Sequence, residues 1–96
     1  MQRITERHLQ AIVNRLNEIT SSPMEPYTRD ADERFVANVG NFHLDYAYGK
    51  VKLVRMGNES GGITSLTGFG TKRETYNAIH AFMDGYVSAL TDVKSN

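Results

Sequence analysis

Charged and small residues gather where a glycine-rich stretch of the sequence gives way to a helical pattern. Lys72 and Arg73 follow Gly70 and Thr71 directly, and they fall in the first turn of the helix that the next residues predict. A helix N-terminus offers unpaired backbone N–H groups and a partial positive charge, so an anion is stabilised there. Helices usually carry acids at this point, and two cations instead favour a site for a negatively charged ligand. The alternative is that Glu74 already satisfies the cap and the two cations are only solvated.

Arg55 and the loop that follows it, residues 57–62, form the second candidate site. We expect Arg55 on an otherwise apolar sheet face, where a guanidinium needs an acceptor. That acceptor can be a carboxylate such as Glu59, or a ligand phosphate, which a guanidinium fits with two hydrogen bonds. If Arg55 and the helix start meet in space, they form one cationic pocket with aromatic rims, which suits a nucleotide. The predicted ligand-binding residues are Arg55, Asn58, Phe69, Gly70, Thr71, Lys72, Arg73 and Tyr76.

The remaining polar residues do not form a catalytic pattern in the sequence. His8, His43 and His80 share no metal-ligand spacing, and we interpret them as surface or boundary residues. An acid–base pair of His43 with Asp45 on one strand face is the minor alternative. No serine has a base that the sequence can identify. We therefore expect no catalytic residue, no metal, no cofactor and no enzyme activity.

Two amphipathic helices are predicted at the ends of the chain. Between Thr5 and Thr20 the apolar residues recur at spacings of three and four, and the helix ends at Ser21-Ser22-Pro23 because the residue before a proline avoids helical geometry. Thr71 to Glu74 matches a capping box, so the second helix begins there. Its apolar stripe comprises Tyr76, Ile79, Phe82, Met83, Tyr86, Val87 and Leu90.

Alternating residues with two glycine-first turns, Gly40-Asn41 and Gly49-Lys50, predict a three-stranded antiparallel meander over 34–39, 42–48 and 51–56. Each dipeptide suits a type II′ turn. Before the meander, Pro23 to Tyr27 reads as an extended crossing and Thr28 to Glu33 as a polar loop. After it, residues 57–62 form a loop and residues 63–66 can add a short fourth strand.

The two turns also set a register for the strands. Val39 is predicted to face Phe42, and Tyr48 to face Val51, so that Arg55 lies opposite Leu44. One sheet face is then almost wholly apolar. The other is mixed and leaves apolar patches that a monomer of this size would not need, formed by Val36, Val54 and Met56. We predict an α+β fold of two layers, in which both helices cover the apolar face.

Length and composition bound the class of protein. The 96 residues form one domain, 1–96, because smaller pieces could not bury a core. The absence of cysteine removes thiolate chemistry and indicates a cytoplasmic location. Eleven cations balance eleven anions, so nucleic-acid binding is disfavoured, as is capture by an anionic membrane. No apolar run is long enough for a membrane span, and we expect no signal peptide.

Several motifs together resemble a family of small proteins encoded by bacteriophages and prophages. The likeness spans residues 9 to 90 and includes Glu25-Pro26-Tyr27-Thr28, Ala37-Asn38-Val39-Gly40-Asn41, Ala47-Tyr48-Gly49, Arg55, Asn58-Glu59 and Gly70-Thr71-Lys72-Arg73-Glu74. Within that group the chain is similar to the phage anti-Thoeris sponge proteins, although it is short for that family. The resemblance implies a non-enzymatic oligomer that binds and sequesters cyclic ADP-ribose, and no binding residue is carried over from it.

These observations lead to two expectations for function. The first is a phage-type sponge in the host cytoplasm, which sequesters a small phosphorylated signalling nucleotide, either a cyclic ADP-ribose isomer or a cyclic oligonucleotide, without turnover. The second is a protein-interaction module that inhibits a host enzyme through its exposed sheet face. We also expect a homo-oligomer, because the elements bury little area and the second sheet face is half apolar.

Overall fold

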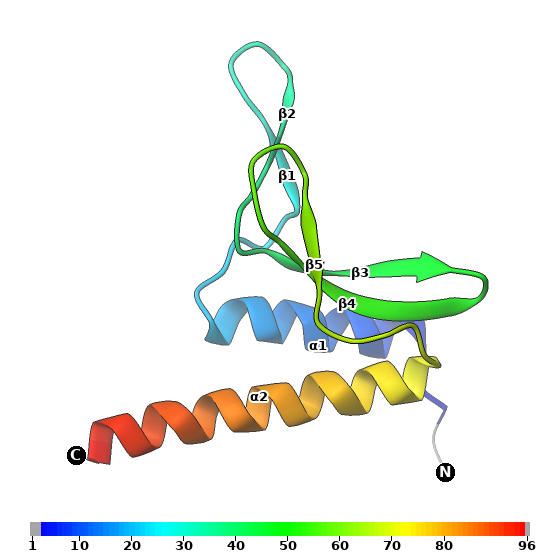
Figure 1. Cartoon of the computed structure of the whole chain (residues 1–96), viewed down its shortest axis with the longest axis vertical. Helices are drawn as coiled ribbons and strands as arrows, with labels where there is room; N and C mark the ends of the chain where they lie inside the picture. The colour runs from blue at the N-terminus through cyan, green and yellow to red at the C-terminus, as the bar shows by residue number, and fades with distance from the viewer. Residues whose placement is uncertain (1–2, 96) are drawn as a thin grey trace.

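The computed structural model describes residues 3–95 and has two helices and two small antiparallel sheets (Figure 1). Helix α1 spans Glu6–Ile19 and helix α2 spans Lys72–Ser95. Between them lie β1 (Tyr27–Arg29), β2 (Phe35–Ala37), β3 (Phe42–Ala47), β4 (Lys50–Met56) and β5 (Ile63–Ser65). The predicted α+β class and the predicted helix–strand–helix order are confirmed.

Helix α1 begins and ends where the sequence predicts. Thr5 caps it, because the Thr5 hydroxyl accepts the N–H of His8 at 3.3 Å and the His8 ring accepts the N–H of Thr5 at 3.2 Å. His8 therefore has a structural role in this cap, which the sequence analysis did not foresee. The apolar stripe is buried, and it comprises Leu9, Ile12, Val13 and Leu16.

Helix α2 starts at the predicted capping box. The N–H of Thr71 donates to the Glu74 carboxylate at 2.9 Å, and the N–H of Glu74 donates to the Thr71 hydroxyl at 3.1 Å. The helix has 24 residues, against 14 in α1, so it is about 36 Å long and α1 about 21 Å. Both helices run in the same direction, and the end of α2 extends beyond the end of α1 (Figure 1).

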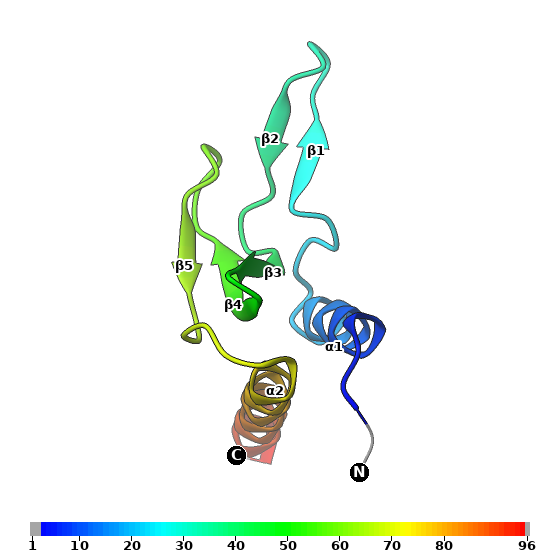
Figure 2. The same cartoon turned by 90° about the vertical axis from the view of Figure 1, so that its right-hand side faces the viewer.

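The two helices cover one face of the three-stranded sheet, as Figure 2 shows along the helix axes. Helix α1 packs on β3, and α2 packs on β4 and on α1. The residues of the resulting core come from all these elements and are Ile12, Val13, Leu16, Phe42, Leu53 and Ile79. The predicted two-layer arrangement is therefore correct.

The predicted partner of the strand near 34–39 is wrong. Strand β2 does not join β3; it pairs with β1 in a separate two-stranded sheet, with Tyr27 opposite Ala37. The three-stranded sheet has the order β3-β4-β5, so the expected short fourth strand is its third member. Residues 27–29 are thus a strand, where the sequence predicted a crossing and a polar loop.

A side chain of α1 occupies the sheet edge that β2 was expected to take. The Asn17 amide donates to the Phe42 carbonyl at 3.0 Å, and the Phe42 N–H donates to the Asn17 side-chain oxygen at 2.9 Å. These are the two hydrogen bonds that a neighbouring strand would have made with Phe42. Residues 38–41 turn the chain between the sheets, with Gly40 at a φ of 96°.

The second hairpin forms with a different turn from the one predicted. Tyr48 and Gly49 have φ values of 54° and 74°, as a type I′ turn requires, and Ala47 lies opposite Lys50. The register is therefore shifted by two residues, and Tyr46 faces Val51. A shift of two keeps every side chain on its predicted face. Arg55 accordingly remains on the helix side of the sheet, opposite Phe42 in place of Leu44.

The predicted apolar patch on the outer sheet face is also wrong. Val54 and Met56 are buried, with exposed fractions of 0% and 1%, and Val36 is half-buried. The chain between β2 and β3 bonds to the end of β4, since the N–H of Gly40 donates to the Met56 carbonyl at 2.9 Å. The β1–β2 hairpin itself projects away from the helices (Figure 1).

We expect one histidine to make the stability of the fold depend on pH. His43 lies on the outer face of β3, and its Nδ1 is 3.1 Å from the Asn41 side-chain oxygen. Partial burial lowers the pKa of His43 below 6.5, and the nearby Asp45 carboxylate opposes this only in part. The unfolded chain then binds more protons than the folded chain below pH 6.5, so the free energy of unfolding decreases as pH falls through that value.

We expect NMR titration to give His43 a pKa below 6.5 in the folded chain. We also expect urea unfolding to show a smaller loss of stability between about pH 7.5 and about pH 5.5 in His43→Gln than in the wild type. A His43 pKa at or above 6.5 would contradict this assignment.

Candidate anion-binding site

A basic hollow lies at the start of α2 and contains part of the predicted site. It has a volume of about 480 Å³, and its lining residues are Arg3, Ile4, Tyr48, Gly49, Lys50, Thr71, Lys72 and Arg73. Three segments meet in it: the chain before α1, the β3–β4 turn and the first turn of α2. Val51 and Gly70 hold the last two together, because each N–H donates to the carbonyl of the other at 2.9 Å.

The lining of the hollow is strongly cationic. Arg3, Lys50, Lys72 and Arg73 all contribute to it, and none of its lining residues is an acid. The Lys72 ammonium lies 3.7 Å from the Glu6 carboxylate, but both side chains are about half exposed. A surface pair of this kind contributes little and is open to competition by a ligand. The hollow therefore keeps an excess of positive charge in a chain with no net charge.

Two neighbouring acids are already engaged in the fold. The Tyr46 hydroxyl donates to Glu6 at 2.5 Å. Burial and this hydrogen bond to Glu6 raise the pKa of Tyr46 to about 12. The Glu74 carboxylate accepts hydrogen bonds from Thr71, which lower the pKa of Glu74. Glu74 thus serves the helix cap, as the alternative interpretation held, and the charge that the hollow offers to an anion comes from its cationic side chains.

The hollow gathers three of the predicted residues, and its five other lining residues include two cations and an aromatic residue that the sequence analysis missed. Thr71, Lys72 and Arg73 lie in it as expected, and Arg3, Lys50 and Tyr48 join them. The tyrosine is fully exposed at the tip of the hairpin, so its ring is available for stacking. The predicted turn and the observed turn both place Tyr48 and Lys50 at the hairpin end. The sequence carried no signal that this end lies beside the start of α2, because the Val51–Gly70 bridge joins residues that are distant in the chain.

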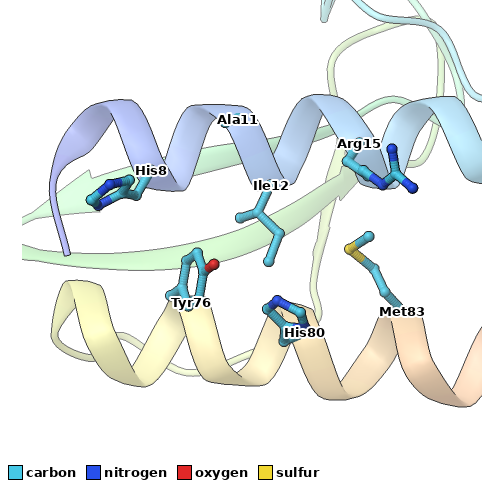
Figure 3. A pocket seen from close by; sticks show the side chains of 7 residues that line it. All are labelled: His8, Ala11, Ile12, Arg15, Tyr76, His80 and Met83. Carbon is cyan, nitrogen blue, oxygen red and sulfur yellow. The ribbon is translucent and has the colours of Figure 1, made fainter. Parts of the chain in front are cut away.

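Phe69 and Gly70 line a different depression, of about 230 Å³, beside Glu74. The Lys52 ammonium lies 4.6 Å from the centre of the Phe69 ring on this side of the sheet. Tyr76 lies in the groove between the helices, with its ring centre 5.3 Å from that of His80 (Figure 3). These aromatic side chains do not form the expected rims of the cationic site.

Arg55 and Asn58 lie at the other end of the sheet. The Arg55 Nε donates to the Gly40 carbonyl at 3.2 Å, and its guanidinium carbon is 4.6 Å from the centre of the Phe42 ring. Arg55 lies about 16 Å from Lys50 along β4. The Asn58 side-chain oxygen accepts two loop N–H groups at 3.0 Å. Within one chain these residues do not meet the basic hollow, and a role in ligand binding stays a prediction.

Two further properties of the described residues bear on the site. Within residues 3–95, neither helix combines the length and the apolar character that a membrane crossing needs. Among residues 3–90, whose side chains the structure describes, no three His, Asp or Glu side chains come together in a way that could hold a metal ion.

Comparisons of the chain with protein-family models, with curated proteins and with solved structures found no match in any of the three. The resemblance to phage sponge proteins therefore stays a prediction from sequence motifs. The basic hollow is the feature on which a functional proposal can be based.

Proposed function

We propose that this chain binds a small phosphorylated ligand in the basic hollow and sequesters it without turnover. The observation that carries the proposal is the gathering of four cationic side chains from three segments around one hollow of about 480 Å³. That volume is in the range of small-ligand sites. Lysine ammonium groups and guanidinium groups both bind phosphate oxygens strongly.

A nucleotide is the ligand class that this surface fits best. Tyr48 offers an exposed ring beside Lys50 and Lys72, so a base can stack while phosphates pair with the cations. Together with the sequence resemblance, this supports a phage-type sponge acting in the host cytoplasm. Its ligand is then a cyclic ADP-ribose isomer or a cyclic oligonucleotide, and the working form is a homo-oligomer.

Calorimetry tests the proposal with cyclic ADP-ribose isomers and with cyclic di- and trinucleotides at low salt. We expect Lys50→Ala to weaken binding about 10- to 100-fold, because a hydrogen bond to a charged group contributes about 1.5–3 kcal/mol. Lys52→Ala is the matched control: it removes the same group from the same strand, beside Phe69 and outside the hollow. It should change the affinity less than about twofold.

Intact ligand should be recovered after the complex is denatured by heat. Conversion of the ligand would mean that the chain is an enzyme. No heat with any of these ligands, or an equal loss of affinity in Lys52→Ala, would remove the proposal.

The second candidate function is inhibition of a host enzyme. The surface that we assign to it is the β1–β2 hairpin and no longer the sheet face. Phe35 is 67% exposed there and Tyr27 46%, with the Arg29 guanidinium 5.0 Å from the Phe35 ring centre. A two-stranded hairpin is marginally stable alone, and a protein partner could cover these rings. A host enzyme inhibited by the wild type and unaffected by Phe35→Ser would favour this function.

A further inference from the structure

The groove between the two helices is a second hollow of the molecule. It has a volume of about 290 Å³, and its lining residues are His8, Ala11, Ile12, Arg15, Tyr76, His80 and Met83. Figure 3 shows these side chains meeting between α1 and α2, with the sheet behind the helices. The groove is mostly apolar at its base and has a guanidinium at one end.

The α2 side of this groove follows a regular helical pattern that continues beyond it. Tyr76, His80 and Met83 line the groove, and Val87 and Leu90 follow at the same alternating spacing of four and three. This spacing is that of the contact positions of a coiled coil. The first half of the stripe, from Tyr76 to Met83, therefore faces α1. The second half, with Val87 and Leu90, extends beyond the end of α1.

The second half of the stripe is poorly covered. Helix α2 is about 15 Å longer than α1, and its end extends past the end of α1 (Figure 1). On this overhanging part Val87 and Leu90 are 49% and 43% exposed. An apolar stripe on a helix normally faces another element. Here the groove and the overhang follow one another along the same helix, α2.

We propose that a second copy of this chain covers both, with the two α2 helices antiparallel about a two-fold axis near Met83 and Val87. The symmetry makes the surface self-complementary, because the overhang of each copy then lies along the groove of the other. The result is a four-helix arrangement of α1 and α2 from both copies. It gives the expected homo-oligomer a defined interface and does not depend on ligand binding.

The charged side chains near the groove support a second copy of this chain as the partner. They also support an antiparallel orientation of the two α2 helices. Arg15 lies beside Met83 in the groove (Figure 3), and it makes no ion pair with any residue that the structure describes. Asp84 is the one acid between Glu74 and Leu90 in the sequence, and it too lacks an ion pair with any side chain of residues 3–90, which the structure describes. An antiparallel pair about this axis brings the Asp84 carboxylate of one copy toward the Arg15 guanidinium of the other. The zero net charge of the chain adds no repulsion between copies.

The proposed surface is small, because each copy contributes one groove and the end of one helix. We expect an interface near the lower limit for specific contacts, which is about 1,000 Å². We therefore expect a dissociation constant on the order of 1–100 μM. Sedimentation velocity of the full chain at concentrations from about 5 to about 300 μM brackets such a constant and measures it directly.

Two sets of variants test the surface, each checked for helicity by circular dichroism. Leu90→Glu should weaken the dimer at least about tenfold, because both copies then bury a carboxylate. Leu66→Glu is the matched control, since Leu66 is similarly exposed, at 39%, but lies after β5. Arg15→Glu and Asp84→Arg should each weaken the dimer about three- to tenfold, and the double variant should recover it.

A chain that stays monomeric over this whole range would overturn the proposal. So would a dimer that Leu66→Glu weakens as much as Leu90→Glu, because the interface would then lie elsewhere. Failure of the double charge variant to recover the dimer would overturn the antiparallel arrangement.

Discussion

Replacing Phe42 with alanine is expected to lower the free energy of unfolding by about 3–5 kcal/mol. Phe42 is 2% exposed and belongs to the core that joins both helices to the sheet. Its ring centre lies 5.9 Å from that of Phe82 and 4.6 Å from the Arg55 guanidinium carbon. Alanine would remove these contacts and leave a cavity. A domain of this size has about 5–15 kcal/mol of stability in total, so the variant would be near the limit of folding.

Urea unfolding followed by circular dichroism measures this effect. Phe35→Ala is the matched control, because it deletes the same atoms from a side chain that is 67% exposed. It loses only an edge contact with Tyr27 and a contact with Arg29, and we expect a cost below about 1 kcal/mol. Equal losses in the two variants would mean that Phe42 is not a core residue.

The elements that the sequence predicted correctly are those set by local signals. The capping box from Thr71 to Glu74 and the spacing of apolar residues indicated both helices, because a helix is formed from contacts three and four residues apart. The faces of β3 and β4 were also correct. Side chains alternate along a strand whatever its partner, so a register error of two residues leaves the faces unchanged.

Strand pairing was not predictable in the same way, because the partner is chosen by distant residues. The alternation in 34–39 is compatible with either β1 or β3 as a neighbour. We expect the choice to depend on Asn17, which is 25 residues from Phe42 and takes its hydrogen bonds. The sequence shows Asn17 only as a polar residue beside an apolar stripe, and nothing local indicates its partner.

The residues of the candidate site also divide into those that the sequence could place together and those that only the tertiary structure brings together or separates. Thr71, Lys72 and Arg73 are neighbours in the sequence, so they necessarily lie together. Lys50 reaches them through the Val51–Gly70 bridge, which only the tertiary structure reveals. Arg55 is separated from the hollow by the length of β4, and a strand is too stiff to bring its two ends together.

Replacing Asn17 with leucine is the second large effect that we expect, with a cost of about 2–4 kcal/mol. Asn17 is 1% exposed, and leucine has a similar size, so the packing volume changes little. The variant would leave the buried N–H and carbonyl of Phe42 without their partners. Each such unsatisfied group costs about 1–3 kcal/mol, and the added apolar burial offsets only part of this.

Asn77→Leu provides the control for this substitution, because Asn77 is exposed on α2 and should tolerate the change within about 0.5 kcal/mol. Hydrogen exchange adds a local measurement: the Phe42 amide should lose protection in Asn17→Leu and keep it in Asn77→Leu. If Asn17→Leu were as stable as the wild type, with a protected Phe42 amide, another group would have to cover this edge of β3. The asparagine would then not be the reason why β2 pairs with β1.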